Sequence, residues 1–126
     1  MKKITILFAL LLLAFTMNGQ ISEGFEDLTG GYTTGTVTLT SGDWDVNSVF
    51  PEAANASRTG SKAARINDDT SNAHITTPSI AGGIGNVTFF YRELNSGGGI
   101  FEVFKSTDGV NFTSVDTQAF SGTSYS

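Results

Sequence analysis

Apolar and polar side chains alternate with a period of two along several short stretches of the chain, and this pattern predicts β-strands. The later stretches are rich in aromatic and β-branched residues, which favour a pleated, half-buried surface. The predicted strands are residues 36–40, 44–49, 62–67, 73–77, 87–92, 100–105 and 110–116. No stretch after residue 20 has a convincing helical period, so the pattern predicts an all-β protein.

Two turns separate the last three predicted strands. Residues 95–99 are rich in glycine, which adopts backbone angles that other residues avoid. Residues 106–109 end in Asp108 and Gly109, a pair that supplies the positive φ of a tight hairpin. We therefore expect residues 85–116 to form a three-stranded antiparallel meander. With roughly seven or eight short strands in all, the predicted architecture is an antiparallel β-sandwich.

Residues 1–19 have the pattern of a secretory signal peptide. Lys2 and Lys3 precede the apolar residues 4–17, and cleavage is expected before Gln20. The alternative is a membrane anchor, but a run of about 14 residues is shorter than the roughly 20 that a spanning helix requires. We expect a signal-peptide helix at 1–19 and one β domain at 20–126, secreted to the extracellular space or the cell surface without further membrane association.

Composition narrows the classes of partner. The chain has twelve acidic and seven basic residues, and removal of Lys2 and Lys3 leaves a net charge of −7. An acidic surface repels phosphate backbones, so nucleic-acid binding is not expected. The absence of cysteine excludes disulfides, thiolate metal sites, cysteine nucleophiles and attachment through a lipidated cysteine.

The catalytic signals are weak, and the sequence predicts a protein that is not an enzyme. His74 is the only histidine and has no G-x-S-x-G nucleophile motif nearby, so a hydrolytic triad is not indicated. Carboxylate pairs for glycoside hydrolysis need a cleft between them, whereas acids on turns are usually solvated. The pairs considered are Asp68 with Asp69, Asp43 with Asp45, and Glu93 with Glu102.

Four residues are candidates for binding a carbohydrate. Trp44 and Tyr91 supply flat rings that stack on a sugar, and Arg92 and Asn95 supply polar groups for its hydroxyls. The alternative for both aromatic residues is a core position, because each alternates with apolar neighbours. The loop at residues 95–99 is the expected ligand edge, since loops on a rigid scaffold carry recognition.

Glu23, Glu26 and Asp27 lie close together in sequence near the expected mature N-terminus. Carboxylate oxygens are the ligands that Ca²⁺ prefers, so these three residues are the candidate ligands of a structural calcium ion. The alternative is that they are ordinary surface acids. No cofactor is otherwise required by the expected function.

Several phrases of the sequence resemble a known kind of module. They are residues 23–27 (EGFED), 42–44 (GDW), 60–66 (GSKAARI), 75–80 (ITTPSI), 85–91 (GNVTFFY) and 106–112 (STDGVNF). Together they resemble the jelly-roll modules of secreted bacterial proteins, similar to galactose-binding-like and MAM-like adhesin domains. The resemblance implies a jelly-roll sandwich, often with a structural calcium ion, that serves adhesion or binding beside an extracellular hydrolase.

The chain departs from that pattern in its length. Neither a catalytic domain nor a sorting domain is present, and a last strand or two of the jelly roll is expected beyond Tyr125, so we expect a C-terminally incomplete fragment. Phe112 also stands where the modules usually have tryptophan. The expected function is a secreted, non-catalytic module that binds a glycan or cell-surface component. The alternative is an accessory or spacer domain of a truncated extracellular hydrolase or nuclease with no ligand of its own.

Overall fold

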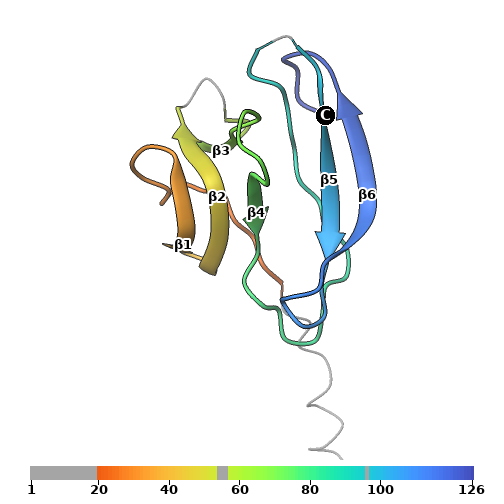
Figure 1. Ribbon diagram of the computed structural model, residues 1–126. Coiled ribbons are helices and arrows are strands. Elements are labelled where there is room, and N and C mark those ends of the chain that lie inside the picture. The colour runs from red at the N-terminus through yellow and green to blue at the C-terminus, as the bar shows by residue number, and fades with distance from the viewer. Residues whose placement is uncertain (1–19, 54–56, 96) are drawn as a thin grey trace, which may run out of the picture.

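The structure is a computed structural model that describes residues 20–53, 57–95 and 97–126. Within these residues the protein is all-β, has no helix and contains two antiparallel sheets (Figure 1). The predicted all-β class and antiparallel pairing are therefore confirmed. The predicted signal peptide at residues 1–19 lies outside the described residues.

The first sheet, sheet A, is built around the long strand β2 (Gly42–Glu52). Strand β1 (Thr33–Leu39) pairs antiparallel with one edge of β2. The other edge is shared by two short strands, β4 (His74–Thr76) and β3 (Ala63–Ile66), which follow one another along β2. All four strands overlap predicted ones, although β2 begins before the predicted strand at 44–49 and continues beyond it through Pro51.

Strand β2 changes direction at Ser48, between the segments that pair with β4 and β3. Ser48 has a φ of 56°, which is rare for a residue with a side chain. Its N–H donates to the Thr34 hydroxyl (3.1 Å), and its carbonyl accepts the Asn67 N–H (3.0 Å). The register of β1 with β2 shifts at the same place. This bulge lets one long strand serve two short partners.

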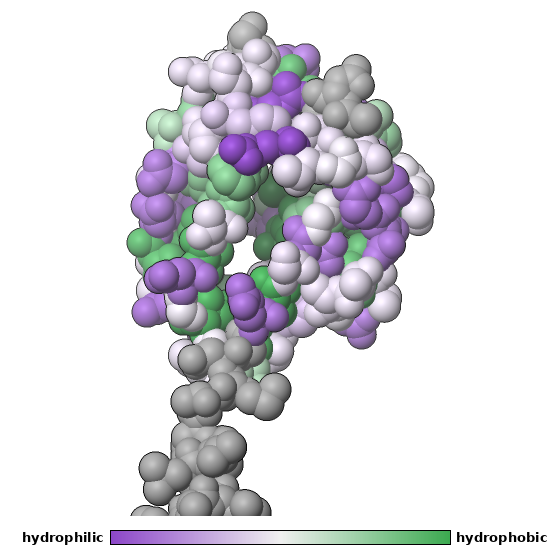
Figure 2. All heavy atoms as spheres, turned by 180° about the vertical axis from the view of Figure 1, so that it is seen from behind, coloured by the Kyte–Doolittle hydropathy of each residue, from purple (hydrophilic) through white to green (hydrophobic). Residues whose placement is uncertain are grey.

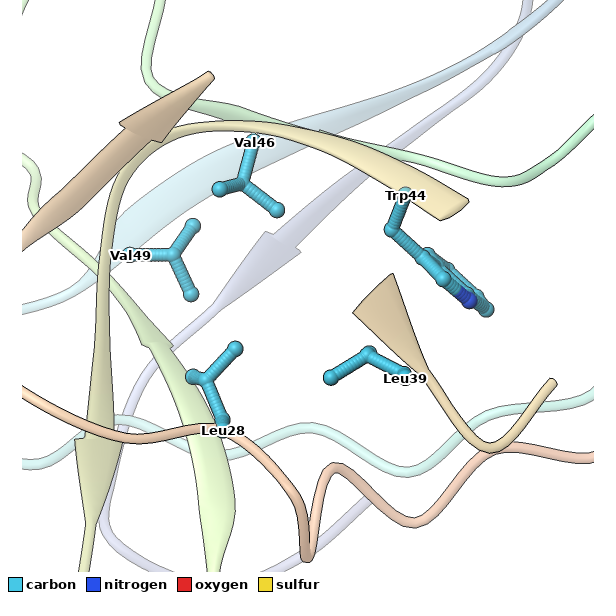
Figure 3. Close-up of a cluster of buried hydrophobic side chains, with 5 residues drawn as sticks. All are labelled: Leu28, Leu39, Trp44, Val46 and Val49. Carbon is cyan, nitrogen blue, oxygen red and sulfur yellow. The ribbon is translucent and has the colours of Figure 1, made fainter. Parts of the chain in front are cut away.

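The hydrophobic core lies on one face of sheet A (Figure 3). Its buried side chains come from β1, β2 and the irregular segment before β1. They are Leu28, Leu39, Trp44, Val46 and Val49. The N-terminal segment is held in place by Lys62, whose Nζ donates to the carbonyls of Glu26 (2.7 Å) and Leu28 (2.8 Å). A segment without strand structure thus supplies one wall of the core.

The second sheet, sheet B, is a hairpin of β5 (Gly99–Lys105) and β6 (Thr113–Phe120). Strand β5 was predicted, but β6 begins later and ends later than the expected strand at 110–116. Asp108 explains the late start, because its carboxylate accepts the N–H groups of Val110 (2.9 Å) and Asn111 (2.8 Å). These bonds keep residues 106–112 in a loop.

The prediction of a strand at residues 87–92 is wrong. The main chain of Tyr91 exchanges two hydrogen bonds with Ser126 (3.0 and 3.5 Å), and the Glu93 N–H donates to the Gly122 carbonyl (3.3 Å). The segment is therefore bonded to the C-terminal residues and is not the first strand of a meander. The described part of the chain accordingly has six strands rather than seven or eight.

The half of the chain that contains sheet B leaves much apolar surface open. Among the described residues after Val49, none is buried. Figure 2 shows a hollow in the surface, with hydrophobic residues along its rim. The exposed large hydrophobic side chains of this half are Ile84, Val87, Phe89, Phe90, Leu94, Ile100, Phe104, Val110, Phe112 and Val115. Because a two-stranded sheet is marginally stable alone, we expect sheet A to dominate the stability.

Candidate functional site

The predicted ligand residues fall in two separate places, and Trp44 belongs to the core. Its side chain is 7% exposed, and its ring packs edge-on against Phe25 with centroids 5.3 Å apart. The indole Nε1 donates to the Ser41 hydroxyl (2.9 Å). No face of the indole is therefore open for stacking on a sugar, and the alternative core position describes this residue.

Tyr91 lies in the other half of the molecule, in an aromatic cluster with Phe89, Phe101 and Phe120. Its ring centroid is 4.6 Å from that of Phe101 and 6.0 Å from that of Phe120, both in edge-on contacts. The side chain is partly exposed. The cluster fixes the orientation of the Tyr91 ring while part of the ring still reaches the surface.

The Arg92 side chain contacts the C-terminal segment. Its Nη1 donates to the Thr123 carbonyl (3.2 Å), and its guanidinium carbon lies 5.4 Å from the centroid of the Tyr125 ring. A guanidinium above an aromatic face is a favourable cation–π contact. The position of Arg92 therefore depends on where the C-terminal residues lie.

Asn95 is exposed and lies in the turn between this segment and β5. Its carbonyl accepts the N–H of Gly97 (3.0 Å), which closes the turn. Gly98 has a φ of 77°, a conformation that favours glycine. Gly97 and Gly98 thus belong to a turn before β5, and the exposed Asn95 lies at its surface.

Glu93 organises this region, a role that the sequence does not reveal. One carboxylate oxygen accepts the N–H groups of Gly97 (2.6 Å) and Gly98, and the other accepts the N–H of Gly122 (3.0 Å). Desolvation alone would raise the pKa of Glu93, but the three N–H groups, of Gly122, Gly97 and Gly98, together lower that pKa below its usual 4.5. Gly122 is distant in sequence, so no local motif signals this contact.

We call this surface the loop edge. It consists of Tyr91, Arg92, Glu93, Asn95, Thr123 and Tyr125. It presents aromatic rings, a guanidinium, an amide and main-chain polar groups on one end of sheet B. Such a set can hold a polar ligand by stacking and hydrogen bonding, and it includes three of the four predicted ligand residues.

The three candidate calcium ligands turn to different protein partners. Glu23 accepts the N–H of Phe25 (2.7 Å) and, through its other oxygen, the hydroxyl of Ser41. Asp27 accepts the N–H and hydroxyl of Thr40. These carboxylates therefore attach the N-terminal segment to the turn between β1 and β2.

Glu26 reaches a different turn, at residues 60–62. The Ser61 hydroxyl and N–H donate to its carboxylate and lower the pKa of Glu26, with a smaller contribution from Lys62. Among the residues that the structure describes, no three or more histidine or acidic side chains are grouped to hold a metal ion. As arranged, the three carboxylates do not fit one shared calcium ion.

His74 is engaged on both sides of its ring. Nδ1 lies 2.7 Å from the Asn72 carbonyl, and Nε2 lies 3.1 Å from the Asp45 carboxylate. Both ring nitrogens thus face acceptors of the protein itself. The contacts join β4 to β2 and give the imidazole a structural role.

A pocket lies between residues 27–29 and strand β1, with a volume of about 230 Å³. Small-molecule sites usually measure roughly 300–1,000 Å³, so this pocket is small for a ligand. Of the predicted site residues only Asp27 lines it, and Asp27 is occupied by Thr40. The loop edge remains the better candidate site.

Comparison of the chain with protein-family models, with curated proteins and with solved structures found no match. Within the described ranges, no helix is long and apolar enough to cross a bilayer.

Proposed function

We propose that this chain is a secreted, non-catalytic binding or adhesion module that contacts a glycan or another cell-surface component. The observation that supports the proposal is that Tyr91, Arg92 and Asn95 lie within five residues of one another before β5. The Tyr91 ring is held by the aromatic cluster, the Arg92 guanidinium by the Thr123 carbonyl, and the Asn95 main chain by the N–H of Gly97. Recognition by contact needs such pre-positioned groups and no proton transfer.

The chemistry of the loop edge suits a sugar better than other ligands. An aromatic ring packs against the apolar face of a sugar, while planar amide and guanidinium groups bond its hydroxyls. The surrounding residues form loops on a sheet, where recognition commonly occurs. A net charge of −7 outside residues 1–19 argues against nucleic acid as the partner.

The proposal includes jelly-roll topology and export. Two antiparallel sheets are compatible with a sandwich of this kind, and the six sequence phrases that resemble jelly-roll modules support it. Export is supported by the basic and apolar residues of 1–19. The place of action would then be the extracellular space or the cell surface, with no membrane association after cleavage.

A glycan array probed with the purified protein tests the proposal. We expect binding to a subset of glycans, and at least tenfold weaker binding for Asn95→Ala and Arg92→Gln. Matched controls are Asn86→Ala and Lys105→Gln, which change an exposed amide and an exposed cation away from the loop edge. Melting curves of all four variants check folding. An array without any bound glycan, or equal binding by all variants, would refute the proposed site.

The second candidate is an accessory or spacer domain of an extracellular hydrolase or nuclease, with no ligand of its own. The apolar side chains exposed between Ile84 and Val115 favour it, because contiguous apolar surface commonly packs against other polypeptide. The reading frame after the codon for Ser126 tests this candidate. A following catalytic domain together with a blank glycan array would support it, and bound glycans would contradict it.

A further inference from the structure

We propose that Glu93 is the positioning residue of the loop edge: its carboxylate joins the turn before β5 to the C-terminal segment and thereby sets the places of Arg92 and Asn95. This inference rests on the proposed function. It concerns Glu93, which forms no salt bridge with another described residue. Its role would be to hold two segments that are far apart in sequence in one arrangement.

The first step is the number of bonds that end on this one side chain. The carboxylate accepts three backbone N–H groups, two from Gly97 and Gly98 and one from Gly122. Backbone N–H groups are obligatory donors, and bonds to an ionised acceptor are the stronger kind. The turn and the C-terminal segment therefore share one anchor.

The second step links this anchor to Arg92. The Glu93 main chain also donates to the Gly122 carbonyl (3.3 Å), so Glu93 and Gly122 are joined by main chain and side chain together. The next carbonyl, of Thr123, accepts the Arg92 guanidinium (3.2 Å). Displacement of Gly122 would consequently move the acceptor on which Arg92 depends.

The third step is the contact of the turn with the carboxylate. A Cβ placed on Gly97 would lie 3.4 Å from Glu93 Oε1, an ordinary van der Waals distance, so the turn lies directly against the carboxylate. The turn that carries Asn95 is thus packed directly on Glu93. The two polar residues of the predicted site are both positioned relative to one carboxylate.

The charged surroundings of Glu93 are simple. In the described part of the chain, no salt bridge involves Glu93, and its contacts are backbone N–H groups. The neighbouring charge is Arg92, which turns to Thr123 and the Tyr125 ring. Titration of Glu93 is therefore expected to act through the three N–H bonds.

Glutamine cannot replace this carboxylate. A carboxylate is acceptor-only on both oxygens, whereas the amide of glutamine has one oxygen and an NH₂ donor. Glu93→Gln therefore leaves at least one of the three glycine N–H groups facing a donor. The matched control is Glu102→Gln, which makes the same change at an exposed position of β5.

Nuclear magnetic resonance of the full protein tests the inference directly. In Glu93→Gln we expect the amide protons of Gly97, Gly98 and Gly122 to shift upfield and their exchange with solvent to accelerate at least tenfold. In the wild-type protein the same three amides should follow one titration with a midpoint below 4.5, which the variant lacks. Glu102→Gln should leave all three amides unchanged.

The outcomes separate this inference from the proposed function. Unchanged glycine amides in Glu93→Gln overturn the inference, whatever the array shows. Shifted amides with undiminished binding of a glycan that the wild-type protein binds also overturn the positioning role, while the proposed function stands. If the wild-type protein binds no glycan, the proposed function fails, and the amide response alone decides whether Glu93 sets the geometry of the two segments.

Discussion

Replacing Leu28 by alanine should destabilise the protein far more than its place in an irregular segment suggests. Leu28 is 2% exposed and packs with the side chains of β1 and β2 in the core. The substitution removes three carbon atoms, which amounts to roughly 2.4 kcal/mol at about 0.8 kcal/mol per buried CH₂. The cavity left behind raises the cost, so the expected loss of unfolding free energy lies at about 2–5 kcal/mol.

Urea denaturation followed by tryptophan fluorescence measures this loss. Trp44 is the only tryptophan and belongs to the same core, so its emission reports directly on the packing that Leu28 supports. The matched control is Leu94→Ala, because Leu94 is 37% exposed in the turn before β5. We expect the control to cost about 1 kcal/mol or less, since surface substitutions usually have small effects.

The comparison of the two leucines decides whether the N-terminal segment is part of the fold. A loss below about 1 kcal/mol for Leu28→Ala, or a loss equal to that of Leu94→Ala, would contradict the reasoning, because it lies below the range for a buried leucine. Residues 20–28 would then not contribute to the hydrophobic core.

Three further predictions concern the N-terminal segment and the carboxylates. Gly60→Ala should destabilise the protein more than Gly30→Ala. Both glycines have positive φ, but a Cβ on Gly60 would lie 2.0 Å from Glu26 Oε1, whereas a Cβ on Gly30 would meet no atom within 4 Å. Equal melting temperatures of the two variants would refute this contact. The pKa values of Glu26, Glu93 and Asp108 are lowered in the folded state, and that of Asp108 is lowered chiefly by the Asn111 N–H. The stability that these ionised carboxylates contribute is therefore complete above their usual pKa values, 4.5 for glutamate and 3.8 for aspartate, and is lost as the pH falls further. The melting temperature should therefore be level from about pH 7 to pH 5 and fall below pH 4.5, and a rise on acidification would contradict it. EDTA should leave the melting temperature unchanged because the acidic residues near the N-terminus already accept protein hydrogen bonds; an increase of several degrees with added Ca²⁺ would show that they regroup around an ion.

The alternation of apolar and polar side chains was sufficient to predict most strands, because it indicates which face of a strand is buried. The strands of sheet A and β5 lie where the period of two places them. Their ends were less certain: Pro51 stays in β2 because residues 49–52 pair with β3, a partner distant in sequence. The start of β6 depends on Asp108, which draws the N–H groups of Val110 and Asn111 into the loop.

The alternation of apolar and polar residues could not predict the long-range contacts. Residues 87–92 alternate as a strand would, yet the main chain of Tyr91 bonds to Ser126, and the next bond, from Glu93, goes to Gly122. Trp44 was a candidate ligand residue with a core position as the alternative, and its contacts with Phe25 and Ser41 place it in the core. Glu93 became a candidate positioning residue only because three glycine N–H groups converge on it from two segments.

The central claim is that the protein works by contact at the loop edge, and an NMR titration with a glycan bound on the array tests it most directly. The account predicts that the perturbed amides cluster at residues 91–95, 97–99 and 122–125, while the indole signal of Trp44 stays in place. Perturbations centred on sheet A, or no perturbation by any glycan, would contradict it.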